Sequence, residues 1–201
     1  MFKRVLTAGL LVTQFFVSTS YAVESPFDRG CLLLGGGGTY MSIAPDNSWS
    51  DENVNLTIIY PTVGYFVSKR MCAGVTLLLG KLSMGETEFS TSAIGPQLTY
   101  YFASRKQLDS YTGRAVPYLT ASALIGVLSE GGADINVRSY ILGGGAVAMI
   151  SKNVGGFCEL SYSFDHLKAT EPAASIYDTE DETIYDGTRF GVQLGVRLFV
   201  W

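Results

Sequence analysis

The stretch SAIGPQLTYYF, Ser92–Phe102, shows the pattern that decides the fold. Its even-numbered positions from 94 onward are apolar or aromatic: Ile94, Pro96, Leu98, Tyr100 and Phe102. The positions between them are small or polar and end in an aromatic residue: Ala93, Gly95, Gln97, Thr99 and Tyr101. A β-strand places successive side chains on opposite faces, so this alternation predicts a strand with one apolar face. A tilted strand of about ten residues also suffices to cross a membrane in a barrel.

The same alternation appears in two segments near the C-terminus. In Val154–Phe164 and Phe190–Leu198, apolar and aromatic residues alternate with glycine, serine and single polar or charged residues. Five further segments complete a set of eight predicted strands: Cys31–Ile43, Val54–Val67, Met71–Leu82, Ala115–Leu128 and Ile135–Ile150. Eight is the smallest strand number of bacterial membrane barrels, and an even number returns both ends of the chain to one side.

The composition favours a membrane barrel over other proteins whose strands alternate between apolar and polar residues. Charged residues are 16% of the 201, against a usual figure of about 25%, while 47% are hydrophobic and 23 are glycine. These values exclude a disordered, highly charged chain. No stretch after the N-terminus reaches the roughly 18 apolar residues that a spanning helix needs. A soluble sandwich also alternates, but low charge and glycine-rich inner faces favour the membrane barrel.

The N-terminus has the order of a secretory signal peptide. Lys3 and Arg4 precede the apolar segment Val5–Val17, and small residues, with Ser20 and Ala22 at the −3 and −1 places, follow it. We expect cleavage after Ala22, which leaves residues 1–22 as signal peptide and residues 23–201 as one barrel domain. An uncleaved short anchor is the alternative. Losing two positive charges moves the net charge from −4 to −6, which argues against nucleic-acid binding.

The predicted connections fall into two groups. Those on one side are turns: Val67–Met71, Ala103–Arg114 and Ser151–Asn153. Those on the other side are loops: Ala44–Asn53, Ser83–Phe89, Ser129–Asp134 and the long Asp165–Gly187. Short turns of such barrels face the periplasm and longer loops face outward, so both termini are expected in the periplasm.

Four stretches resemble a known family. They are PTVGYFVSKRMCAGVTLLLG (Pro61–Gly80), IGPQLTYYF (Ile94–Phe102), PYLTASALIG (Pro117–Gly126) and GVQLGVRLFVW (Gly191–Trp201). The chain resembles, over nearly all of residues 31–201, the small outer-membrane barrels related to the OmpA membrane domain and OmpX. The resemblance implies an all-β fold, an eight-stranded antiparallel transmembrane β-barrel in up-and-down meander order. It also implies a monomer in the bacterial outer membrane, with outer-membrane lipid and lipopolysaccharide as partners.

The family also has an aromatic residue at the C-terminus, which the barrel-assembly machinery recognises. This resemblance assigns Phe199 and Trp201 as the C-terminal assembly signal. The apolar face of the last strand, however, falls on even numbers, whereas these two residues fall on odd ones. Either a β-bulge shifts the parity, or Val200 faces outward and Trp201 overhangs, where an indole suits the interfacial girdle.

The sequence offers little for catalysis or ligand chemistry. The single histidine, His166, begins the longest loop. Lipid A deacylase barrels have a serine two residues from their histidine, but this chain has Lys168 at the matching position. That loop holds seven acids: Asp165, Glu171, Asp178, Glu180, Asp181, Glu182 and Asp186. Their spacing is not that of a calcium loop, so a hydrated acidic loop is favoured over a cation site. The three cysteines are interpreted as small apolar fillers. We expect no catalytic residues, metal or cofactor.

A barrel of eight strands has an interior just wide enough for side chains to fill. The predicted function is therefore a non-enzymatic integral outer-membrane protein with surface loops, acting in envelope structure or surface adhesion. A narrow channel or a carrier for small or hydrophobic solutes is the alternative, and a lipid A-modifying enzyme a further one. Inside the barrel, Glu159 and Arg197 fall on inward faces at similar depth. We expect them to interact, directly or through one water, rather than to hydrate separately.

Overall fold

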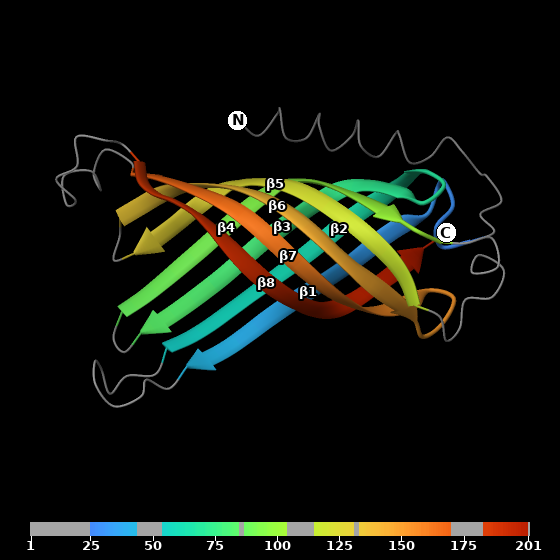
Figure 1. The fold of residues 1–201 in the computed structure, drawn as a ribbon, viewed down its shortest axis with the longest axis horizontal. Helices are drawn as coiled ribbons and strands as arrows, with labels where there is room; N and C mark the ends of the chain where they lie inside the picture. Colours follow the sequence, from blue (N-terminus) through green and yellow to red (C-terminus); the bar gives the residue numbers. More distant parts are fainter. Residues whose placement is uncertain are drawn as a thin grey trace, which may run out of the picture.

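The computed structural model describes residues 25–43, 54–84, 87–103, 115–130, 133–169 and 183–200. Eight strands form a closed antiparallel barrel in which each strand pairs with the next and β8 returns to β1 (Figure 1). The strands are β1 (Leu32–Ile43), β2 (Val54–Ser68), β3 (Met71–Met84), β4 (Thr87–Tyr101), β5 (Ala115–Glu130), β6 (Ala133–Met149), β7 (Val154–Ala169) and β8 (Thr183–Val200). The predicted all-β meander barrel is confirmed. The described residues contain no helix with the length and apolar character of a membrane span.

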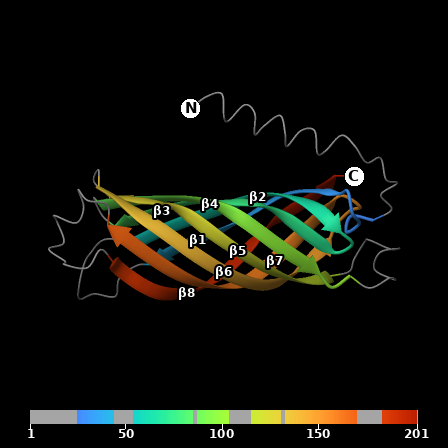
Figure 2. The ribbon, with the colours of Figure 1, turned by 90° about the horizontal axis from the view of Figure 1, so that it is seen from above.

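The two ends of the barrel differ. β1 begins and β8 ends at the same end, which also carries the β2–β3 and β6–β7 turns (Figure 2). We call it the near end, and the opposite end the far end. The β2–β3 turn is tight, and Arg70 adopts a positive φ of 70° there. Two of the three connections at the near end are therefore short, and the third, between β4 and β5, includes residues 104–114, which lie outside the described residues.

The alternation seen in the sequence separates the outside of the wall from the inside. On β4, Leu98 is 49% exposed, whereas its neighbour Thr99 is 3% exposed. Exposed apolar and aromatic residues run from Ile94 to Phe102 on this strand and from Phe190 to Val200 on β8. We call the band that such residues make around the barrel the apolar belt. A belt of this extent is stabilised by lipid rather than by water.

Several strands are longer at the far end than the sequence predicts. β3 reaches Met84 and β4 begins at Thr87, so most of the predicted loop Ser83–Phe89 is a hairpin. β5 and β6 likewise pair as far as Glu130 and Ala133, and β7 and β8 take both ends of the predicted loop Asp165–Gly187. The alternation fades there because these residues lie beyond the apolar belt. Backbone pairing does not need apolar side chains, so the strands continue.

Candidate functional site: the plugged lumen

The near end of the lumen is closed by an aromatic plug. Phe27, from the short segment before β1, lies among Tyr101, Phe199 and Phe66, with ring centroids 5.0, 5.3 and 6.2 Å away. All four rings are almost completely buried. Such tilted and edge-to-face packing is favourable between aromatic rings.

The segment that carries Phe27 is held by its backbone. The Arg70 amide donates to the Phe27 carbonyl at 2.7 Å, and the Gly30 amide donates to the Phe66 carbonyl at 3.0 Å. Asp28 also pairs at 3.7 Å with Lys69, whose side chain is exposed. The β2–β3 turn therefore fixes the segment across the mouth of the barrel. We call residues Ser25–Gly30 the strap.

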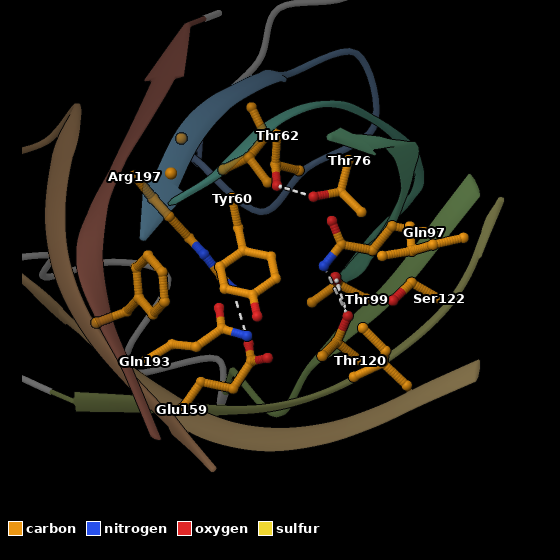
Figure 3. Close-up of a pocket in the computed structure, with 16 residues that line it drawn as sticks. Tyr60, Thr62, Thr76, Gln97, Thr99, Thr120, Ser122, Glu159, Gln193 and Arg197 are labelled. Carbon is orange, nitrogen blue, oxygen red and sulfur yellow. Dashed lines mark hydrogen bonds and ion pairs between the residues drawn. The ribbon is translucent and has the colours of Figure 1, made fainter. Parts of the chain in front are cut away.

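Next to the plug, farther into the lumen, lies a cavity of about 40 Å³ (Figure 3). Its lining combines apolar residues and glycines (Leu33, Gly35, Gly36, Leu124, Ile141 and Phe157) with hydroxyls, amides, one acid and one base (Tyr60, Thr62, Thr76, Gln97, Thr99, Thr120, Ser122, Gln193, Glu159 and Arg197). Many of these groups bond one another, as Gln97 Nε2 donates to Thr120 Oγ1 at 2.9 Å and the Thr62 and Thr76 hydroxyls lie 3.0 Å apart. At roughly 10–15 Å³ for each water, the cavity is the size of about three water molecules.

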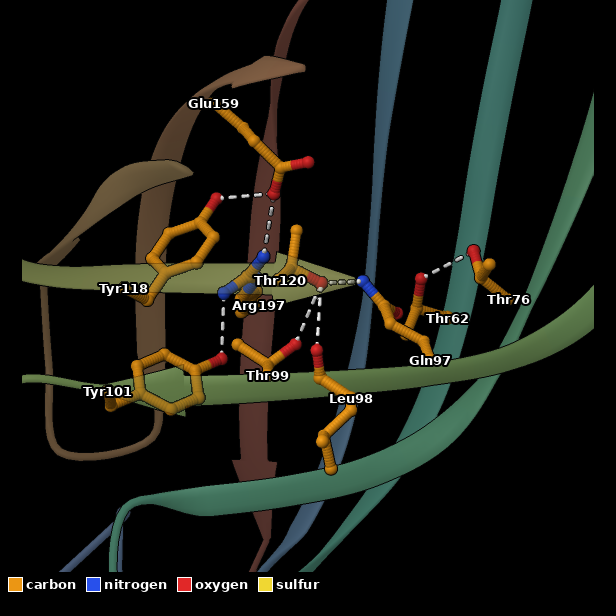
Figure 4. Close-up of polar contacts among 10 residues, drawn as sticks. All are labelled: Thr62, Thr76, Gln97, Leu98, Thr99, Tyr101, Tyr118, Thr120, Glu159 and Arg197. Carbon is orange, nitrogen blue, oxygen red and sulfur yellow. Dashed lines mark hydrogen bonds and ion pairs between the residues drawn. The ribbon is translucent and has the colours of Figure 1, made fainter. Parts of the chain in front are cut away.

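Glu159 and Arg197 meet at the base of this cavity. Arg197 Nη2 lies 3.4 Å from Glu159 Oε2, and both side chains are 6% exposed. The Tyr118 hydroxyl donates to the same carboxylate oxygen at 2.9 Å, and Arg197 Nη1 donates to the Tyr101 hydroxyl at 2.7 Å (Figure 4). A buried charge without a partner is costly, whereas here each charge has an opposite charge and a hydroxyl.

Aromatic rings and glycines shape the space for the pair. The Arg197 guanidinium carbon lies 4.0 Å from the Tyr118 ring centroid and 4.5 Å from that of Phe157, distances typical of cation–π contacts. A Cβ at Gly143 would come within 2.6 Å of Glu159 Oε1. One at Gly35 would lie 3.2 Å from Arg197 Cγ. Both glycines belong to the glycine runs of the sequence, which thus mark where the largest inward side chains lie.

Two further layers fill the far half of the lumen. The first is an apolar cluster of Ile58, Leu78, Ala93, Leu124 and Ile141. The second is a charged group in which Arg189 pairs with Asp165 at 3.4 Å, and the hydroxyls of Ser139 and Ser163 donate to Asp165 at 2.6 and 3.2 Å. Among the described residues, no buried side-chain nitrogen or oxygen lacks a hydrogen-bond partner.

This arrangement corrects the prediction for the start of the longest loop. Asp165 and His166 lie within β7, where Asp165 pairs with Gly187 and His166 with Asp186. They remain in the strand because its backbone ladder continues past Phe164, the last exposed aromatic residue of β7. The acids between positions 171 and 182 lie outside the described residues, and within the described ranges no three His, Cys, Asp or Glu residues come together as a possible metal site.

The cysteines divide into two kinds. Cys31 and Cys72 are buried near the aromatic plug, in keeping with the prediction of apolar fillers. Burial raises the pKa of the Cys31 thiol to about 12, so it stays protonated at neutral pH. Cys158 is exposed on the outer face of β7, and for it the filler prediction is wrong. Its even position in the alternation places it among outward residues such as Leu160.

The end of β8 shows which of its last residues face outward. Its pairing with β1 is continuous from Leu194 to Val200, so no bulge intervenes. Phe199 is fully buried in the plug and Val200 faces outward, the second of the two alternatives. Asn153, in the β6–β7 turn, fixes this end, because its side chain donates to the Phe199 carbonyl at 2.7 Å. Trp201 and Ala22 lie outside the described residues.

Sequence reasoning missed part of this site. Tyr101 and Tyr118 are inward members of alternating segments, and this position was the signal that could have placed them beside the ion pair. Phe27 carries no such signal, because it precedes the first strand and belongs to no periodic pattern. Its role follows only from the strap's path across the barrel mouth.

No protein-family model matches the sequence, and no curated protein matches it. Among solved structures, the crystal structure of Neisserial surface protein A is similar, with a TM-score of 0.53 and 16% sequence identity over 84% of this chain and 94% of that one. A structure of the outer-membrane expressed OmpT of Vibrio cholerae is also 16% identical, with a TM-score of 0.32 over 85% of this chain and 52% of that one. The first likeness is one of fold, and the second is too weak to support an argument.

Proposed function

We propose that this chain is a non-enzymatic integral protein of the bacterial outer membrane, with a side-chain-filled lumen and its far-end loops at the cell surface. Three observations support the proposal: the closed eight-stranded barrel, the apolar belt, and the shared fold with Neisserial surface protein A. The role of such a protein is to strengthen the envelope or to contact surroundings through its loops. We place the near end in the periplasm and the far end, with its long β1–β2 and β7–β8 connections, outside the cell.

The succession of barriers in the lumen carries this proposal. A solute would have to pass the charged group around Asp165, the apolar cluster, the Glu159–Arg197 pair and the aromatic plug. These barriers draw on side chains from seven strands, β2 to β8, and from the strap, so no single rotamer change opens a path. A static barrel of this kind supports adhesion or structure better than permeation.

Planar-bilayer conductance tests the proposal. The purified full chain should insert and give no steady channels at moderate voltage. Inserted protein is verified in parallel by protease protection of the same preparation in vesicles. Stable channels of uniform size would overturn the proposal and favour the narrow-channel alternative.

The absence of catalysis is tested separately. Cells that express the protein should have lipid A of unchanged mass. A new lipid A species that disappears in the His166→Ala variant would overturn the non-enzymatic part of the proposal. A matched Tyr162→Ala variant, altered on the outer face of the same strand, shows whether such a change is specific to the imidazole.

A further inference from the structure

Basic side chains collect at the near end of the barrel. Among the described residues, the strap and the β2–β3 and β6–β7 turns carry Arg29, Lys69, Arg70 and Lys152, against the single acid Asp28. Figure 1 shows both turns at the end of the barrel where β8 ends. By contrast, residues 170–182, which connect β7 and β8 at the far end, contain five acids and no lysine or arginine. The two ends of the barrel therefore differ in the sign of their charge.

Two of the basic residues lie just beyond the apolar belt. Lys69 comes two positions after the outward-facing Val67, and its side chain is 77% exposed. Lys152, also exposed, comes two positions after Ile150, which is 69% exposed. Two residues span at most about 7 Å along a strand, and each head-group layer of a bilayer is about 5–7 Å thick. With the belt in hydrocarbon, both ammonium groups lie at the depth of the lipid head groups.

Arg70 occupies a backbone position that favours glycine. Its φ of 70° is in the left-handed region, where a residue with a Cβ is strained. The backbone is fixed there, because the Arg70 amide donates to the Phe27 carbonyl at 2.7 Å and the Arg70 carbonyl accepts from the Tyr101 amide at 2.8 Å. The Arg70 side chain forms no hydrogen bond or ion pair with another described residue. A strained residue without an internal contact to offset the strain indicates a contact outside the molecule.

The strap adds a second guanidinium beside this turn. Phe27 is bonded to Arg70 through the backbone, so Arg29, which is exposed, lies two residues from that contact. Asp28 lies between them in the sequence and pairs with Lys69 at 3.7 Å. Four basic residues and this one acid leave the near end with a net charge of +3. A net positive charge of this size attracts anions rather than neutral or cationic groups.

The surroundings of the β2–β3 turn favour lipid as the source of these anions. Met71, the first residue after the turn, is opposite Tyr100 in the ladder. Tyr100 and Phe102 are both exposed on the outer wall, and their ring centroids lie 5.1 Å apart. Outward aromatic rings of membrane proteins concentrate at the interface between hydrocarbon and head groups. The basic residues therefore lie beside the level at which phosphate groups surround the barrel.

We propose that the near end of the barrel binds anionic phospholipids. Their phosphate head groups are held by Arg29, Lys69, Arg70 and Lys152, and their acyl chains lie along the apolar belt. This inference rests on the proposed membrane location and adds a lipid preference to one end of the barrel.

Electron spin resonance of spin-labelled lipids tests the preference. The full chain is reconstituted in phosphatidylcholine vesicles with a trace of phosphatidylglycerol or phosphatidylcholine that carries the same nitroxide on its acyl chain. Lipid beside the barrel gives a motionally restricted signal, and the restricted fractions of the two probes give their relative affinity. We expect phosphatidylglycerol to be favoured at least about twofold at low salt. The preference should fall towards equality in 1 M salt, where the Debye length is about 3 Å.

Arg70→Gly is the most informative variant, because the strain and the lipid contact predict different effects. Glycine relieves the strain at φ 70°, so the urea midpoint of unfolding should stay the same or rise, while the preference for phosphatidylglycerol falls. Adding Lys69→Gln and Lys152→Gln should bring the two probes close to equality. Lys81→Gln removes an exposed lysine from the far part of β3 and is the matched control that should leave the preference unchanged.

Each outcome has a distinct meaning. Equal restricted fractions for the two probes, or a preference that the three near-end substitutions leave unchanged, would overturn the inference while leaving the membrane location intact. An equal loss in Lys81→Gln would overturn the assignment to the near end. A lower urea midpoint in Arg70→Gly would mean that this side chain supports the fold instead of a lipid.

The same vesicles separate lipid from a soluble partner. Soluble polyglutamate that binds them through the four near-end residues, without any preference between the lipid probes, would assign the basic end to an acidic protein and overturn the lipid site. Absence of any motionally restricted lipid would contradict the membrane location itself.

Discussion

Each buried charge inside this barrel is stabilised by several modest interactions with neighbouring side chains. Arg197 has an anion, a hydroxyl and two aromatic faces within reach, and Glu159 has a cation and a phenol. The two residues are not opposite in the ladder, because Glu159 pairs with Gln193 and Gly155 with Arg197. The length of the arginine side chain spans this offset. A lysine would bring the charge but not the planar group that stacks on Tyr118 and Phe157.

The first prediction concerns this pair. Glu159→Gln or Arg197→Gln alone should lower the free energy of unfolding by about 3–5 kcal/mol, because each leaves an uncompensated buried charge. The double variant should lose clearly less than the sum of the two, since no lone charge remains. Urea titration of the protein in phospholipid vesicles measures all four members of the cycle. Strictly additive losses would contradict the contact, and Tyr118→Phe serves as the control that removes only a hydroxyl.

At the scale of elements, the strap closes the near end of the barrel, although it is not one of the eight strands. It has no strand pairing of its own beyond two backbone bonds, yet it brings a large buried ring to the centre of the near end. Its attachment to the β2–β3 turn joins the chain's beginning to a hairpin that lies some forty residues later. The aromatic plug thus links the strap with β2, β4 and β8.

The second prediction concerns the strap. Phe27→Ala should lower the free energy of unfolding by about 3–5 kcal/mol, the usual cost of truncating a buried aromatic ring to alanine. Phe102→Ala, which removes an aromatic ring of the same size from the exposed outer face, should cost much less. The urea titration described above measures both. Equal losses would mean that Phe27 is not packed in the lumen.

The third prediction concerns the outer face of β4. Leu98 lies midway between Ile94 and Phe102, the ends of the apolar belt on this strand, so Leu98→Arg should cost about 2–4 kcal/mol. Phe102→Arg, at the edge of the belt, should lower the free energy of unfolding less through its charge, because an arginine there reaches the interface. Leu160→Arg and Leu194→Arg should behave like Leu98→Arg. The losses in Leu98→Ala and Phe102→Ala are subtracted from those of the arginine variants to isolate the cost of the charge. Equal charge costs at the two positions would contradict a membrane-spanning belt.

At the scale of the whole molecule, the proposed orientation rests on the difference between the two ends. The near end carries both ends of the strand set, the β2–β3 turn and the plug, whereas the far end carries the connection between β7 and β8, which is rich in acids. Asymmetry of this kind matches the periplasmic and external sides of outer-membrane barrels.

The fourth prediction tests that orientation. A glutamate-specific protease added to intact cells should cut between β7 and β8, where Glu171, Glu180 and Glu182 lie. Trypsin should cut at Lys69 or Arg70 only after the outer membrane is opened. Cleavage at the β2–β3 turn in intact cells, with the β7–β8 connection protected, would invert the orientation. Mass spectrometry of the fragments identifies each site.

The alternation of residue types alone predicts the fold and the two faces of the wall. Strict alternation in Ser92–Phe102 assigned every side chain of that segment to a side, because the period of a strand is two and a lipid-facing wall tolerates few exceptions. Parity also placed Glu159 and Arg197 on the inside. Strand ends were less well determined, because beyond the apolar belt the backbone pairs without any periodic signal in the side chains.

What fills the lumen depends on tertiary contacts between strands. Parity gives the side of a residue but not its neighbours across the barrel, so the contacts of Arg197 with Tyr101 and Tyr118 depend on how eight strands are staggered on closure. The position of Phe27 depends on the path of the strap, and the closure of the barrel depends on the pairing of the first strand with the last. These are relations between residues far apart in the chain, and no local pattern encodes them.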